Sequence, residues 1–143
     1  MNFIYDDGGR SAAGYKGFTG DCACRAAAIA TQRPYQEIYD LINELAKSER
    51  TGKRKHKKSN ARTGVYQNTF IKVMSHYGFK WVATMRIGQG CTTHLRSEEL
   101  PRGRIVVNLS RHYAAIIDGD LHDTYDCTRE GSRCVYGYFI KEG

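Results

Sequence analysis

Three side chains of this sequence have the types and the order of a cysteine nucleophile site: the thiol of Cys22, the imidazole of His112 and the carboxylate of Asp123. In such a site the thiolate attacks an acyl carbon, the histidine carries the proton, and the acid orients the imidazole. A thiol with its ordinary pKa of about 8.5 is mostly protonated at neutral pH, so it needs a neighbour that stabilises its charge. The three residues therefore predict acyl chemistry through a thioester.

The residues around Cys22 predict the start of a helix. Asp21 is a good N-cap residue, and the run from Ala23 to Thr31 is rich in helix formers. Cys22 would then lie in the first turn, where backbone N–H groups and the helix dipole favour a thiolate and an oxyanion. Asp21 itself weakly opposes the thiolate. Cys24 is a rival thiol, but two residues rotate it by about 200° around the helix, so we expect it in the core.

A hairpin is expected to carry the histidine and the acid. Ala114 to Ile117 is an apolar, strand-favouring run, and Asp118-Gly119 is a strong two-residue turn signal. With that turn, Ile117 pairs with Asp120, and the two strands run back from there.

This register decides which acid assists His112. Asp123 lies diagonal to His112 on the same face, Tyr125 lies directly opposite it, and Asp126 points to the other face. A slip of one residue would exchange the two acids, and we favour Asp123. Tyr125 should cover the histidine, whereas Tyr113 should act mainly in packing.

Structural interpretations of the same residues remain open. Free cysteine is among the most buried residue types, so Cys22 has a structural alternative. His112 has the alternative of a hydrogen-bonded histidine at a strand end, and Asp123 that of a solvated hairpin acid.

The pattern resembles the papain-like cysteine peptidases, in which the cysteine lies on an N-terminal helix, the histidine on a strand and the third residue on the next strand. Asp123-Thr124-Tyr125 resembles their Asn-x-Trp step, and the chain is similar to small phage and bacterial proteins of this type through four motifs: Gly-Asp-Cys-x-x-Arg-Ala, Pro-Tyr-x-x-x-Tyr, Leu-Pro-x-Gly-Arg-Ile-Val-Val and His-Tyr-x-x-x-Ile-Asp-Gly. The resemblance implies Cys22, His112 and Asp123 as catalytic residues and Tyr125 as a shield. The family's oxyanion glutamine is missing from positions 15–19, and Gln89 is a candidate donor in its place.

The same resemblance and the periodicity of the chain predict an α+β fold, with a helical N-terminal half packed on an antiparallel C-terminal sheet. The expected elements are helices over 21–31, 34–47 and 66–77 and strands over 81–85, 105–109, 112–117, 120–126 and 135–140. A length of 143 residues suits one domain.

Composition narrows the class of protein. The hydrophobic content of 41% is typical of a globular chain, and no apolar stretch reaches the length of a membrane span. The N-terminus lacks the features of a signal peptide, so we expect a cytoplasmic protein. Its five cysteines are then an odd set in a reducing compartment, and a disulfide framework is not expected. Cys-x-Cys and Cys-x-x-His spacings do not match structural zinc sites, so we expect neither a metal nor a cofactor.

The positive charge is concentrated between Arg50 and Arg62, a segment with seven basic residues and no acidic one. The other 15 basic residues balance the 15 acidic ones, so the net charge of +7 lies in this segment. We expect a mobile loop over about 50–62, more than a Debye length from the thiol. It could contact nucleic acid or an acidic protein, although the aromatic residues of single-strand binders are missing. The candidate contact residues are Lys53, Arg54, Lys55, Lys57 and Lys58.

The sequence therefore predicts a cysteine hydrolase or acyl-transfer enzyme, peptidase-like or amidase-like, that acts on a peptide- or amide-bearing substrate. The alternative is a non-catalytic papain-like binding protein that uses the basic loop.

Overall fold

The computed structural model describes residues 1–17, 19–53 and 57–142. In this part of the chain three α-helices precede most of the strands, as expected, and a turn of 3-10 helix, η1 (Ser97–Glu99), joins two of the strands. The helices are α1 (Cys22–Thr31), α2 (Tyr35–Ala46) and α3 (Gln67–His76). The strands are β1 (Phe3–Tyr5), β2 (Phe79–Ala83), β3 (Arg104–Leu109), β4 (His112–Ile117), β5 (Asp120–Asp123) and β6 (Gly137–Lys141).

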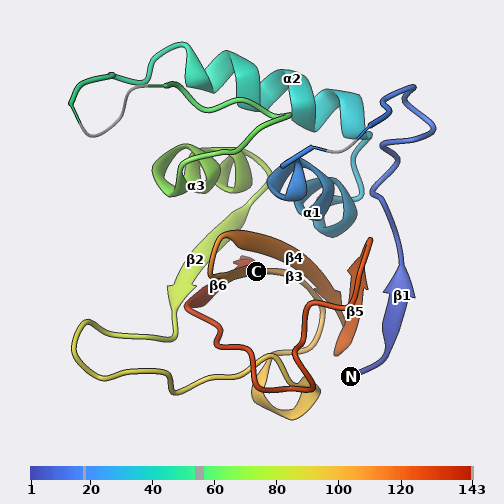
Figure 1. Cartoon of the computed structure of the whole chain (residues 1–143), viewed down its shortest axis with the longest axis vertical. Helices are drawn as coiled ribbons and strands as arrows, with labels where there is room; N and C mark the ends of the chain where they lie inside the picture. The colour runs from blue at the N-terminus through green and yellow to red at the C-terminus, as the bar shows by residue number, and fades with distance from the viewer. Residues whose placement is uncertain (18, 54–56, 143) are drawn as a thin grey trace.

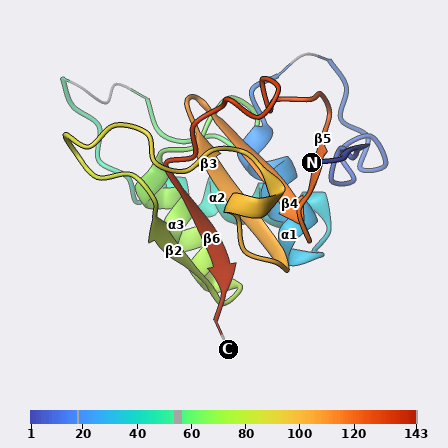
Figure 2. The ribbon, with the colours of Figure 1, turned by 90° about the horizontal axis from the view of Figure 1, so that it is seen from below.

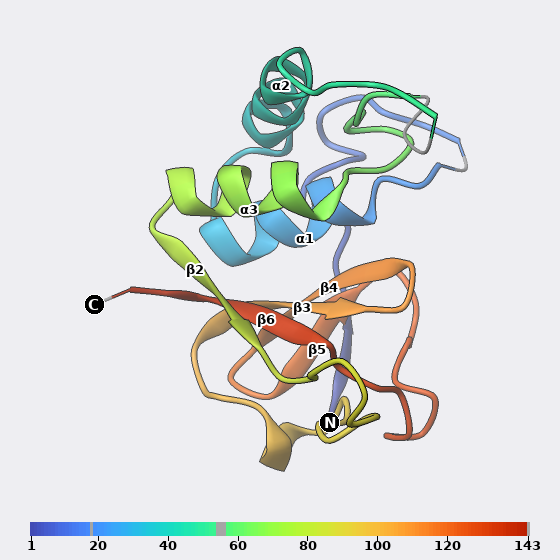
Figure 3. The same ribbon diagram turned by 90° about the vertical axis from the view of Figure 1, so that its left-hand side faces the viewer.

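The strands form one open sheet in the order β1-β5-β4-β3-β6-β2. The helices cover one face, with α1 against β4 and β3, α3 beside β2, and α2 outermost (Figures 1 and 3). Figure 2 shows the opposite face, which is crossed by the long connection from β2 to β3, including the helical turn η1. The architecture is α+β, and the sheet lies between a helical layer and a layer of loops.

The sheet is mixed rather than wholly antiparallel, which corrects the sequence-based expectation. β1 runs parallel to β5, and Phe3, Ile4 and Tyr5 pair with Leu121, His122 and Asp123. All three residues of β1 are exposed, so the short strand has no alternation of apolar and polar residues that would have predicted it.

The hairpin has the expected register. Ile117 pairs with Asp120 and Ala115 with His122. Asp118 and Gly119 both have positive φ, 47° and 83°, as a two-residue type I′ turn requires. This turn places the start of β4 beside the end of β5, which is where the candidate histidine and acid lie.

Apolar side chains pack on both faces of the sheet. Toward the helices, Phe70 and Phe139 meet edge to face with ring centroids 5.2 Å apart. On the other face, Leu95 and Leu100 of the long connection cover Ile116 and Leu121 of the hairpin. These two cores hold α1 and the hairpin in fixed positions relative to each other. None of the described helices has the length and apolar character of a membrane span.

The cysteine expectation is wrong for two of the five, because Cys91 and Cys134 form a disulfide with Cα atoms 5.8 Å apart. Backbone hydrogen bonds on either side, Leu95 N–H to Arg133 O and Val135 N–H to Thr93 O, both 2.8 Å, hold the two segments together. A pairing across 43 residues leaves no local sequence signal. Since disulfides persist in oxidising surroundings, the cysteine count no longer supports a reducing compartment.

Candidate active site

The three predicted site residues lie at the ends of three elements that meet. Cys22 is the first residue of α1, His112 the first of β4 and Asp123 the last of β5. Cys22 and His112 line a cavity of about 370 Å³. The cavity lies between the start of α1 and the β3–β4 turn, which are on the same side of the molecule in Figure 3.

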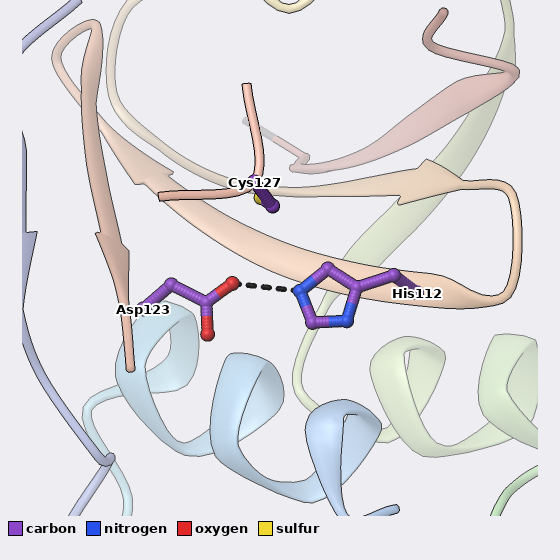
Figure 4. A group of neighbouring side chains, drawn as sticks. All are labelled: His112, Asp123 and Cys127. Atoms are coloured by element: carbon purple, nitrogen blue, oxygen red, sulfur yellow. Dashed lines mark hydrogen bonds and ion pairs between the residues drawn. The ribbon is translucent and has the colours of Figure 1, made fainter. Parts of the chain in front are cut away.

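The histidine and the acid are directly hydrogen-bonded. His112 Nε2 lies 2.7 Å from Asp123 Oδ2, and both side chains are buried (Figure 4). The other oxygen, Asp123 Oδ1, accepts the backbone N–H of Thr124 at 2.7 Å, which fixes the carboxylate plane. Asp126 instead accepts hydrogen bonds from Thr128. The choice of Asp123 over Asp126 as the partner of His112 is therefore confirmed.

The thiol of Cys22 hydrogen-bonds the ring of His112 and accepts the backbone N–H of Tyr113. Burial raises the pKa of Cys22, but the hydrogen bond and the positive charge of His112 outweigh it, with help from the Tyr113 N–H and Arg25, so the pKa lies below its ordinary value. Burial lowers the pKa of His112, yet the hydrogen bonds that its ring makes to Asp123, Cys127 and Cys22 raise this pKa far above its ordinary value. The two residues therefore favour a thiolate–imidazolium pair.

The ring geometry assigns the two nitrogens of His112. Because Nε2 is bound to Asp123, Nδ1 remains for the thiol. Figure 4 shows Nδ1 on the side of the ring that faces α1, the helix that begins with Cys22. The imidazole therefore lies between the thiol and the carboxylate, as a general base with an orienting acid requires.

Cys24 is buried, as expected. Its sulfur lies 3.7 Å from the carbonyl of Tyr35, and burial raises the pKa of the thiol to about 12. A thiol with this pKa is protonated throughout the neutral range. Cys24 is therefore no rival to Cys22 as a nucleophile.

Asp21 does not cap α1 with its side chain, which corrects the sequence-based expectation. Its backbone has φ −94° and ψ 22°, outside the extended region typical of an N-cap residue, and its carboxylate makes no capping hydrogen bond. The carboxylate instead binds Arg25, Arg10 Nε at 3.1 Å and the hydroxyl of Tyr35 at 2.6 Å. The charge of Asp21 is thus held by these partners, and the N–H groups of the first turn are left to other acceptors.

Arg25 is a site residue that the sequence analysis missed. Its buried guanidinium binds Asp21, and Nη2 lies 3.6 Å from Asp123 Oδ1. Arg25 therefore joins the base of α1 to the carboxylate that orients His112. Arg25 lies four residues after Asp21, on the same side of the helix, and this spacing could have predicted the ion pair between them.

Tyr125 lies beside His112, with ring centroids 5.3 Å apart and an angle of 46° between the planes. β5 ends at Asp123, so the loop that follows the strand, rather than a strand ladder, brings the ring there. Tyr125 is 49% exposed. Its ring therefore covers one side of His112 toward solvent.

Replacing Tyr125 with alanine should lower the rate at which iodoacetamide alkylates Cys22 at pH 6, by roughly threefold to tenfold. Without the ring, water competes for the bond between His112 and Asp123 and weakens the charge that stabilises the thiolate. The rate is measured by mass spectrometry of the Cys22 peptide. Tyr125→Phe keeps the ring and should react like the wild type. If both variants lose reactivity equally, the hydroxyl rather than shielding is responsible.

The side chain of Tyr113 packs against the core, as expected, and the residue also borders the site. It packs on Phe70, with ring centroids 4.4 Å apart, but it also lines the Cys22 cavity. Burial and the nearby charge of Cys22 raise the pKa of its phenol to about 12. Tyr113 thus contributes its N–H to the thiol and its ring to the cavity wall.

Gln89 is not among the residues that line the cavity, so the structure gives no support to its predicted oxyanion role. It belongs to the connection between β2 and β3, and this connection runs over the sheet face opposite the helices (Figure 3). Gln67, which starts α3, does line the cavity. Its side-chain oxygen accepts a hydrogen bond from Asn108 Nδ2 at 3.1 Å, which leaves the amide N–H₂ to donate. Gln67 is therefore a better candidate for an oxyanion donor.

The residues that directly follow the basic segment, Thr63 to Val65, form a wall of the cavity. Residues 60–64 form a tight turn, which is closed by a hydrogen bond of 2.8 Å from Asn60 N–H to Gly64 O. The turn lies close to Gly20, because a Cβ atom built on Gly20 would be 3.1 Å from the carbonyl oxygen of Thr63. Ser59 and the following Ala61 are buried, and Asn43 accepts the Ala61 N–H at 2.9 Å. The expected mobile loop is thus anchored at 59–64. Arg54 and Lys55 lie outside the described residues, and Lys53 is exposed.

Within the described chain, His112, Asp123 and Cys127 place nitrogen, oxygen and sulfur ligand atoms within 4.8 Å of one another. Zinc accepts this combination of ligands. However, His112 and Asp123 already bind each other, and the positive charge of Arg25 lies 3.6 Å from Asp123. These charges favour an orienting carboxylate over a cation site.

No family model, curated protein or solved structure matches this chain. The papain-like resemblance therefore rests on the motifs and on the site geometry alone.

Proposed function

We propose that this protein is a cysteine hydrolase or acyl-transfer enzyme of papain-like type, with Cys22 as nucleophile, His112 as general base and acid, and Asp123 as the residue that orients His112. The observation that carries the proposal is the continuous set of hydrogen bonds from the Cys22 thiol through His112 to the buried Asp123. The lowered pKa of Cys22 and the raised pKa of His112 are what a thiolate nucleophile requires.

The chemistry begins when the Cys22 thiolate attacks the carbonyl carbon of an amide or ester. The negative charge on the carbonyl oxygen is stabilised by the N–H groups at the start of α1 and by the side-chain amide of Gln67. His112 then gives its Nδ1 proton to the leaving amine or alcohol, and a thioester remains on Cys22. Water, or another acceptor, gives a proton back to Nδ1 and attacks the thioester, which releases the acyl product and restores the thiolate.

The first test compares Cys22 with an ordinary thiol. At pH 6, iodoacetamide should alkylate Cys22 at least about tenfold faster than it alkylates an unstructured cysteine peptide, because more of the thiol is ionised. Cys24 and Cys127, both buried, should stay unmodified, and peptide mapping by mass spectrometry distinguishes the three. A Cys22 rate equal to that of the peptide would overturn the proposed nucleophile.

The second test looks for the covalent intermediate. p-Nitrophenyl acetate should give a burst of p-nitrophenol equal to the enzyme concentration, together with a mass increase of one acetyl group on the Cys22 peptide. Cys22→Ser should abolish both signals. A burst that survives this substitution would assign the chemistry to another residue.

A further inference from the structure

A basic trough runs past the candidate nucleophile. A hollow of about 430 Å³, lined by Lys57, Lys58 and Tyr66, shares Thr63, Gly64 and Val65 with the cavity of Cys22. Lys57 and Lys58 therefore line a hollow that adjoins the Cys22 cavity. Figure 3 shows the segment before α3 on the same side of the molecule as the start of α1.

The trough continues on the other side of the histidine. A hollow of about 610 Å³ shares Arg111 and His112 with the Cys22 cavity and also contains Arg129. Arg111 is fixed in the turn between β3 and β4, with φ 56°, next to His112. We call these three joined hollows, from Lys57 to Arg129, the basic trough.

Cations outnumber acids along the trough. No acidic residue is among the described residues that line the Cys22 cavity or the Lys57 hollow. Asp126 is the acid of the third hollow, and its carboxylate is already bound by Thr128. Arg133, also of that hollow, is buried and hydrogen-bonds the carbonyl of Ser110, so it fixes the β3–β4 turn. The exposed cations of the trough are therefore Lys57, Lys58, Arg111 and Arg129, and the opposing acid is Asp126. Of these cations, Lys58 also donates from Nζ to the carbonyl of Lys47 at 2.9 Å.

We propose that the trough selects acidic substrates, so that the acyl group attacked by Cys22 belongs to a peptide with Asp or Glu residues on either side of the scissile bond. This inference rests on the proposed function and names its substrate class. An extended peptide advances by about 3.3 Å per residue with side chains alternating in direction. A chain that crosses Cys22 thus presents carboxylates to Lys57 and Lys58 in one direction and to Arg111 and Arg129 in the other. The acyl chemistry of the site favours a peptide over a nucleic acid, whose phosphodiesters offer no acyl carbon.

The charge is tested first with two alkylating reagents of similar size, anionic iodoacetate and neutral iodoacetamide. In Lys57→Gln/Lys58→Gln, the ratio of the two Cys22 alkylation rates at low ionic strength should fall by roughly threefold or more, and its dependence on salt should flatten. The matched control Lys80→Gln/Lys141→Gln changes the net charge equally with exposed residues of β2 and β6, and should leave the ratio unchanged.

The substrate class is tested by binding to Cys22→Ala, which cannot react. Fluorescein-labelled hexaglutamate should bind, as measured by anisotropy at low ionic strength, and should bind at least about fivefold more weakly when Lys57→Gln/Lys58→Gln is added. Hexalysine of the same length should not bind.

The outcomes separate the two proposals. If Cys22 is activated but the ratio of its iodoacetate and iodoacetamide rates is the same in Lys57→Gln/Lys58→Gln as in the wild type, the proposed selection of acidic substrates is wrong. The hydrolase proposal would be unaffected by that result. A Cys22 that reacts with both reagents like a free thiol overturns the hydrolase proposal itself. Tight binding of a thymidine hexanucleotide without binding of hexaglutamate would overturn the assignment to acidic peptides.

Discussion

Replacing His112 with alanine should lower the rate of Cys22 alkylation by iodoacetamide at pH 6 by about 100-fold. Burial alone raises the pKa of the Cys22 thiol, and the hydrogen bond and charge of His112 are the main forces that bring it down. Without them the pKa lies at or above about 8.5, where roughly one thiol in 300 is ionised at pH 6. The rate is followed by mass spectrometry of the Cys22 peptide.

The dependence on pH follows from the directions of the two pKa values. Because the pKa of Cys22 is lowered, the thiolate forms at pH values below the ordinary pKa of a thiol. Because the pKa of His112 is raised, its imidazolium form persists at the same pH values. The alkylation rate of the wild type should therefore rise with a midpoint below about 8.5, and that of His112→Ala with a midpoint at or above it.

The control for this substitution is His76→Ala, which removes an exposed histidine at the end of α3 and should leave the profile unchanged. Both proteins should unfold cooperatively, so that lost reactivity is not lost structure. A His112→Ala protein that keeps more than a tenth of the wild-type rate at pH 6 would mean that another group activates Cys22.

The parts of the site that the sequence predicted depend on local signals. Asp118-Gly119 fixes a two-residue turn, and a fixed turn sets the register of every pair behind it. His112 and Asp123 therefore had to lie near each other. The helix that begins with Cys22 was equally local, because its helix-forming run follows directly.

The parts that the sequence missed depend on contacts between distant segments. Asp21 has the residue type of an N-cap, but Arg10, Arg25 and Tyr35 compete for its carboxylate, and the sequence does not show that they surround it. Gln67 reaches the cavity because α3 begins opposite Asn108. The disulfide and the parallel strand β1 belong to the same class of long-range contacts.

Arg25 should be one of the most important residues for stability, although we assign it no role as nucleophile or base. Replacing it with methionine, which keeps much of the volume, should lower the free energy of unfolding by about 3 kcal/mol, because breaking a buried ion pair leaves charges without compensation. Asp21 is 1% exposed and would keep Arg10 and Tyr35, whereas Asp123, 4% exposed, would keep His112 but lose the guanidinium of Arg25. Urea denaturation measures the change.

Two further variants separate the charge of Arg25 from its volume and from general effects of arginine loss. Arg33→Met removes an exposed arginine that forms the same i,i+4 pair, with Glu37, and should change stability much less, because water screens that pair. Arg25→Met/Asp21→Asn should recover part of the loss, since the double change removes the carboxylate charge together with its partner. An Arg25→Met protein as stable as Arg33→Met would show that the buried charges near His112 do not depend on Arg25. The opposite result is an Arg25→Met protein that unfolds at a lower urea concentration and in which Cys22 also reacts more slowly while the protein is still folded. That result would show that the guanidinium of Arg25 both holds α1 in place and positions the carboxylate that orients His112.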